Sequence, residues 1–185
     1  MLKFLLVILI IIVLIIVWLV STYNGLVRSR NTVDEAYSTM DVYLKKRFDL
    51  IPNLVETVKA YATHENETLQ AVIAARGQIQ SAGTQAERMD AENALSGTLR
   101  SLFAVAEAYP DLKANAGFLD LQQQLKKVEE DIANSRKYYN GSVKAFNNKC
   151  QTFPSSFIAS TFRFEPRTMF EVSREEEREN VKVEF

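Results

Sequence analysis

The sequence has very little of the residue types that most hydrolases and metal proteins use at their reactive centres. Among 185 residues there is one cysteine, Cys150, and one histidine, His64. A lone cysteine excludes an intramolecular disulfide and a cysteine zinc cluster, and it is weakly consistent with a reducing compartment. A lone histidine cannot form a two-histidine zinc motif. We therefore expect neither a metal ion nor another cofactor.

Excess charge of either sign is also absent. Lysine and arginine number 22 and aspartate and glutamate 23, so the chain carries no overall basic field for nucleic acid, and we expect no nucleic-acid partner. No glycine-rich phosphate loop and no serine or cysteine nucleophile elbow is present. His64 and Glu65 are neighbours, but a place in a turn or helix cap explains them sufficiently. We expect no enzymatic activity, and a hydrolase that uses His64 and Glu65 is the alternative.

A long apolar run opens the chain. From Phe4 to Val20 the only polar side-chain group is the indole NH of Trp18. At about 1.5 Å per residue a helix from Leu2 to Tyr23 reaches about 33 Å, which is enough for a hydrocarbon core of about 30 Å, and Trp18 and Tyr23 fall where aromatic residues favour the interface. The run is longer than that of a signal peptide, and the residues after Val20 offer no cleavage site of the Ala-x-Ala kind. Residues 1–23 are thus predicted to be a retained transmembrane anchor in contact with lipid.

The flanking charges give the orientation less clearly. Lys3 and the amino group precede the apolar run, and Arg28 and Arg30 follow it. Because nearby lysine and arginine tend to stay in the cytoplasm, this count slightly favours a cytoplasmic domain. A long domain can cross regardless of its charge, so the side stays open. The expected location is a single-pass position in the inner membrane of a bacterial cell.

Residues 24–152 are predicted to form a helical bundle. Apolar residues alternate at spacings of three and four along residues 26–61, which indicates one long amphipathic helix leading out of the membrane. Arg30 and Arg47 are the polar members of this seam. We favour side chains that lie along the apolar surface with the guanidinium at its rim; a dedicated functional pairing of the two arginines is the alternative. Pro52 predicts a kink, and the unchanged seam phase on both sides favours a continuous helix.

Further helices are expected at residues 67–81, with Ile73 among the inward positions, and at 85–109, ending before Pro110. Asn66 or Thr63 is expected to cap the first of these. A final helix of more than thirty residues follows, with Cys150 on its apolar seam. The prediction is an all-α fold: an N-terminal transmembrane helix followed by an elongated antiparallel bundle whose first and last helices are long.

The end of the chain differs in composition. Residues 153–170 are rich in aromatic side chains, including Phe157, Phe162, Phe164 and Phe170. We favour their packing back on the bundle near its membrane end; contact with a partner or with the membrane is the alternative. Residues 171–185 form a charged tail, and its last residues alternate like a short strand.

Several ordered runs resemble a known family. The longest extends from Leu44 to Val55, and others are Tyr61 to Glu65, Tyr109 to Ala114 and Tyr138 to Val143. Together they resemble the bacterial LemA family over about residues 1–165. The resemblance implies an N-terminal anchor followed by a long helical bundle. It implies no enzymatic reaction, and it implies loose association with membrane proteases and other envelope proteins.

These observations favour a membrane-anchored helical scaffold that self-associates as a homo-oligomer and interacts with other membrane or envelope proteins. The uniform, β-branched anchor lacks a small-xxx-small motif, so close pairing of anchors is not expected. The alternatives are a protein that binds or remodels the bilayer and an accessory subunit of a membrane protease.

Overall fold

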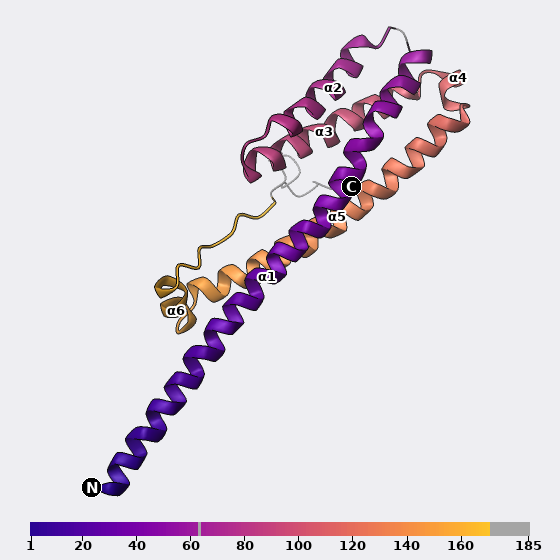
Figure 1. The fold of residues 1–185 in the computed structure, drawn as a ribbon. Helices are drawn as coiled ribbons and strands as arrows, with labels where there is room; N and C mark the ends of the chain where they lie inside the picture. The colour runs from indigo at the N-terminus through magenta and orange to yellow at the C-terminus, as the bar shows by residue number, and fades with distance from the viewer. Residues whose placement is uncertain (63, 171–185) are drawn as a thin grey trace, which may run out of the picture. The chain divides into compact units, whose positions relative to one another are not determined.

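The computed structural model describes residues 1–62 and 64–170, and in these residues the fold is all-helical (Figure 1). The long helices are α1 (Leu2–Tyr61) and α5 (Ala116–Gln151), which pack against each other. Between them lie α2 (Asn66–Ser81), α3 (Gln85–Ala106) and the short α4 (Pro110–Lys113), and α6 (Ser155–Thr161) follows α5. The predicted all-α class and the long first and last helices are confirmed. The charged tail and its expected short strand lie outside the described residues.

The described chain divides into two compact units. The first unit comprises residues 1–39 and 135–169, and the second comprises residues 40–134 with Phe170. Helices α1 and α5 each contribute one part to each unit.

In the first unit, α1 and α5 run in opposite directions. The rings of Tyr37 and Tyr139 lie 5.7 Å apart, and Lys149 Nζ donates to the carbonyl of Gly25 at 3.4 Å. As residue numbers fall along α1 they rise along α5, so the pair is antiparallel. The buried apolar side chains of the two helices follow the predicted spacing: Leu26, Val33 and Ala36 on α1, and Tyr139, Val143, Phe146 and Cys150 on α5.

The apolar core of the second unit is built by all four of its longer helical segments. Ile51, Leu54 and Val58 come from α1, and each is at most 1% exposed. The remaining core residues are Leu69, Val72 and Ala75 of α2, Leu95, Leu99, Leu102 and Ala106 of α3, Leu112 of α4, Phe118 and Leu125 of α5, and Ala62. Burial of each large aliphatic side chain contributes about 1.5–3 kcal/mol, so this core is the main source of the unit's stability.

Helix α1 passes through Pro52 without interruption, as predicted. Proline has no NH, so the carbonyl of Phe48, four residues earlier, loses its helical partner. Arg76 of α2 compensates for this loss. Its Nε donates to that carbonyl at 3.4 Å, and its guanidinium lies 4.0 Å from the centre of the Phe48 ring. A tertiary contact thus stabilises the helix at the point where the sequence weakens it.

Three local predictions were wrong. Helix α3 ends at Ala106 rather than Tyr109, because a separate short helix, α4, begins at Pro110. Asn66 is the first residue of α2 and therefore does not cap it; Thr63 lies outside the described residues. Ile73 is 54% exposed. Successive helical residues rotate by about 100°, so the inward stripe of Leu69, Val72 and Ala75 leaves Ile73 at its edge.

Candidate functional site

The most unusual polar feature of the second unit is a fully buried arginine. Arg47 of α1 has no exposed side-chain surface, although the sequence favoured a guanidinium at the rim. Nη2 donates to Glu92 Oε2 at 2.5 Å, and Nη1 donates to Glu129 Oε1 at 2.6 Å. Nη1 also donates to Ser96 Oγ at 2.5 Å. The guanidinium thus joins α1 to α3 and α5, and the rim prediction for Arg47 is wrong.

The arginine belongs to a chain of alternating charges. The side chain of Glu92 is 1% exposed, and its second oxygen lies 4.0 Å from Nε of Arg88. Arg88 in turn pairs with Asp41 at the surface. We call Asp41, Arg88, Glu92, Arg47, Ser96 and Glu129 the buried charge cluster. Removing such charges from water is costly, and close ion pairs with further hydrogen bonds offset that cost.

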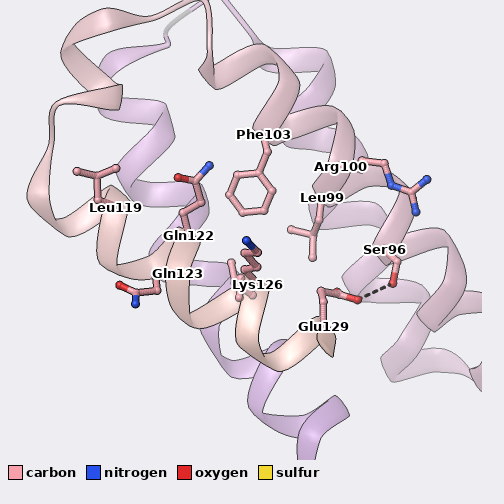
Figure 2. Close-up of a pocket in the computed structure, with 10 residues that line it drawn as sticks. Ser96, Leu99, Arg100, Phe103, Leu119, Gln122, Gln123, Lys126 and Glu129 are labelled. Atoms are coloured by element: carbon pink, nitrogen blue, oxygen red, sulfur yellow. Dashed lines mark hydrogen bonds between the residues drawn. The ribbon is translucent and has the colours of Figure 1, made fainter. Parts of the chain in front are cut away.

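A surface pocket of about 760 Å³ lies beside the cluster, between α3 and α5 (Figure 2). Leu99, Phe103 and Leu125 give it an apolar lining, and Ser96 and Glu129 are shared with the cluster. The remaining lining residues are Arg100, Leu119, Gln122, Gln123 and Lys126. In Figure 2 the ring of Phe103 and the Lys126 side chain lie centrally between the two helices.

The pocket offers little for chemistry. Among its described lining residues none is a histidine or a cysteine. Its single hydroxyl, Ser96 Oγ, accepts from Arg47 and lies 3.5 Å from Glu129 Oε2. A serine beside a buried cation and a carboxylate paired with that cation lacks the free base that activates a nucleophile. In the described part of the chain, no group of three or more His, Cys, Asp or Glu residues is arranged to hold a metal ion.

His64 and Glu65 lie in the turn before α2. The His64 side chain is exposed, and the Glu65 carboxylate accepts a hydrogen bond from the Tyr109 hydroxyl at 2.9 Å. This hydrogen bond favours the neutral phenol and so raises the pKa of Tyr109. Glu65 thus ties the turn before α2 to the turn before α4, a structural role.

In the first unit the aromatic residues gather beside Tyr23. The ring of Phe162 lies 4.8 Å from that of Tyr23, and the ring of Phe164 lies 5.7 Å from it. Phe164 is buried, with Phe146 at 6.4 Å and the guanidinium of Arg30 at 5.4 Å from its ring centre. The predicted packing of the aromatic segment onto the bundle is therefore correct for Phe164. Arg30 is exposed at the rim, as expected. Phe170, which belongs to the second unit, is also buried.

Other predicted residues remain at the surface. Phe157 is 65% exposed, so packing back on the bundle does not account for it, and Phe162 is 56% exposed although its ring contacts Tyr23. Phe4 and Trp18 lie on the apolar part of α1, whose side chains are exposed nearly throughout. That part is long and apolar enough to cross a membrane, which fits a single-pass anchor and also a signal sequence.

Five members of the buried charge cluster were not predicted as site residues: Asp41, Arg88, Glu92, Ser96 and Glu129. A signal for Glu92 was present, because it lies on the inward stripe of α3 between Met89 and Leu95 at spacings of three. An acidic residue on the stripe of one helix and a basic residue on the seam of another together indicate a buried pair. Nothing in the sequence places Glu129 opposite Arg47, since that depends on the register of α5.

Fold and site together describe an all-helical protein whose first helix begins with a membrane-length apolar stretch and whose second unit contains a buried ion cluster. The chain belongs to the LemA family, whose model matches residues 36–185. A relative described as Protein LemA, from Metamycoplasma hominis, is 26% identical over 158 residues. That match covers 83% of this chain and 71% of the relative.

Proposed function

We propose that this protein is a non-catalytic scaffold, held in the bacterial cell membrane by its first helix, that self-associates and presents its helical surfaces to other envelope proteins. The observation that carries the proposal is the continuity of α1, which extends from Leu2 to Tyr61 without a break. The same helix therefore supplies the apolar stretch and one side of the bundle core.

This continuity supports a retained anchor over a cleaved signal sequence. Signal peptidase sites have small residues in an Ala-x-Ala-like arrangement beyond the apolar region, whereas Ser21, Thr22 and Tyr23 offer no such arrangement and are helical. Tyr23 contacts Phe162 and Phe164, and Leu26 is only 1% exposed. Packing of the bundle thus begins within one turn of the apolar stretch, and cleavage there would cut a packed helix.

A binding role is supported over an enzymatic one by the chemistry of the polar groups. The charged groups of the buried charge cluster pair with one another: Arg47 bonds Glu92 and Glu129, and the surface members Asp41 and Arg88 pair with each other. The pocket beside it has an apolar lining and no activated nucleophile. Such surfaces suit contact with other helices.

The anchor is tested by membrane extraction of the full chain at alkaline pH, with the intact mass measured in the membrane fraction. We expect an uncleaved chain that resists extraction. An Ile12→Arg variant should be extracted more readily than the parent, because a charge near the middle of a span costs about 2.5–3.5 kcal/mol on insertion scales. Thr22→Arg is the matched control and should stay in the membrane, since arginine near a helix end can extend to the interface. A soluble chain that lacks its first residues would refute the anchor.

Self-association is a separate part of the proposal. Chemical crosslinking in native membranes should give species larger than the single chain, at expression levels close to natural ones. Only uncrosslinked chain, under conditions that crosslink a known membrane oligomer, would refute it.

The side of the membrane that carries the bundle needs a separate test. Protease that reaches only one face of the same membranes would show on which face the bundle lies. The flanking Arg28 and Arg30 favour the cytoplasmic face.

A further inference from the structure

The segment that follows α5 exposes three large aromatic side chains within ten residues. Phe153, Phe157 and Phe162 are 88%, 65% and 56% exposed. The opposite face of α6 is used for packing, because Ile158 and Ala159 are at most 2% exposed. Single exposed apolar residues are common on soluble proteins, but a cluster of exposed phenylalanines on one short segment marks a contact surface.

The position of this segment relative to the apolar part of α1 is set by ring contacts within the first unit. Phe162 lies 4.8 Å from Tyr23. The middle of the apolar run from Phe4 to Val20 is Ile12. Half of a hydrocarbon core is about 15 Å, or about ten helical residues, so the core should end near Thr22. Phe162 thus contacts α1 at the level where hydrocarbon gives way to lipid headgroups.

We propose that Phe153, Phe157 and Phe162 insert into the headgroup region of the bilayer at the base of the anchor, so that the phospholipid surface is the partner of α6. Two exposed cations lie near this level: Arg163 follows Phe162 in the sequence, and Arg28 lies about 7.5 Å beyond Tyr23 along α1 at 1.5 Å per residue. Apolar side chains flanked by cations are the composition of interfacial membrane contacts. Continuity with the membrane-length stretch of α1 favours lipid over a second protein copy as the occupant.

The inference rests on the proposed anchor, and the single tryptophan allows the two to be tested separately. In the unaltered full chain, reconstituted in phosphatidylcholine and phosphatidylglycerol vesicles, Trp18 fluorescence should be quenched by brominated lipid, which reports the anchor. A Trp18→Phe variant then provides a background without tryptophan. In that background, Phe157→Trp should show blue-shifted emission that lipid brominated near the headgroup quenches several-fold more strongly than lipid brominated near the chain end.

Tyr138→Trp in the same background is the matched control. Tyr138 is also 56% exposed, but its neighbour Tyr139 pairs with Tyr37, which lies about 21 Å beyond Tyr23 along α1. Brominated lipid should leave this variant unquenched. Quenching of Trp18 without quenching of Phe157→Trp overturns the inference and leaves the anchor intact. Failure of both refutes the anchor as well. Blue-shifted Phe157→Trp emission that depends on protein density and not on bromine would assign the surface to a second copy, which also overturns the inference.

Discussion

Replacing Arg47 by methionine should destabilise the bundle strongly, because it removes the cation of the buried charge cluster and leaves Glu92 behind. Breaking a buried ion pair from one side costs about 3–5 kcal/mol. Glu92 is 1% exposed and cannot recover its hydration, but Arg88 Nε lies 4.0 Å from it and compensates in part. Glu129 is 37% exposed and can return to water. We therefore expect the lower end of the range, about 3 kcal/mol.

The measurement is urea unfolding of the full chain in non-ionic detergent, followed by far-ultraviolet circular dichroism at neutral pH. Lys45→Met is the matched control on the same helix. Its ion pair with Asp49 is exposed on both sides, 67% and 55%, so its loss should cost less than about 1 kcal/mol. A second variant, Arg47→Met with Glu92→Met, replaces the pair by apolar side chains of similar size and should recover most of the lost stability.

Either of two results would refute this reasoning. The first is an Arg47→Met variant that unfolds at the same urea concentration as Lys45→Met. The second is a double variant as unstable as Arg47→Met alone, which would show that the cost does not come from the stranded charge of Glu92. An unchanged dependence of the unfolding free energy on urea is needed for these comparisons.

Four further predictions concern single contacts in the second unit. Thr84→Ala should lower the unfolding free energy by about 1 kcal/mol in the same urea assay, because it removes the N-cap of α3. The pKa of Glu87 is lowered mainly by hydrogen bonds from backbone NH groups at that cap. The contribution of Glu87 to the unfolding free energy should therefore be complete above the ordinary glutamate pKa and be lost as pH falls through the lowered pKa. A Glu87→Gln variant whose stability–pH curve matches that of the parent would contradict this. The pKa of Tyr109 is raised by its hydrogen bond to Glu65. The contribution of this hydrogen bond to the unfolding free energy should therefore be complete below the ordinary tyrosine pKa and be lost as pH rises through the raised pKa. Ultraviolet titration should show one tyrosine that ionises at higher pH than the others, and Tyr109→Phe should abolish that step. Arg76→Met should cost about 1 kcal/mol by leaving the carbonyl freed by the proline of α1 without its donor, and no change relative to Lys59→Met would contradict this role.

The sequence predicts the long helices well because each is specified locally. The seam of α1 keeps its phase through Pro52, and the spacing from Phe118 to Cys150 specifies one continuous α5. Both signals depend on the helical repeat alone. The short helices α4 and α6 have no such repeat, since four and seven residues are too few to show one.

The charge cluster and the exposed phenylalanines depend on tertiary register. Arg47 has a long, flexible side chain that can place its guanidinium either at the rim of the bundle or in its interior. Only the positions of Glu92 and Glu129 on neighbouring helices decide between these two placements. In the aromatic segment, composition predicts that phenylalanines will be covered. It cannot separate Phe164, which packs against Tyr23 and Phe146, from Phe157, which is left at the surface.

The most direct test of the central claim is the mass of the native particle, extracted from the membrane with its surrounding lipid and without detergent, with copurifying proteins identified in the same sample. A membrane-anchored, self-associating scaffold predicts one homogeneous particle that contains several copies of the uncleaved chain. A particle with a single copy would contradict self-association. A single copy bound to one other protein would make the chain an accessory subunit of that protein.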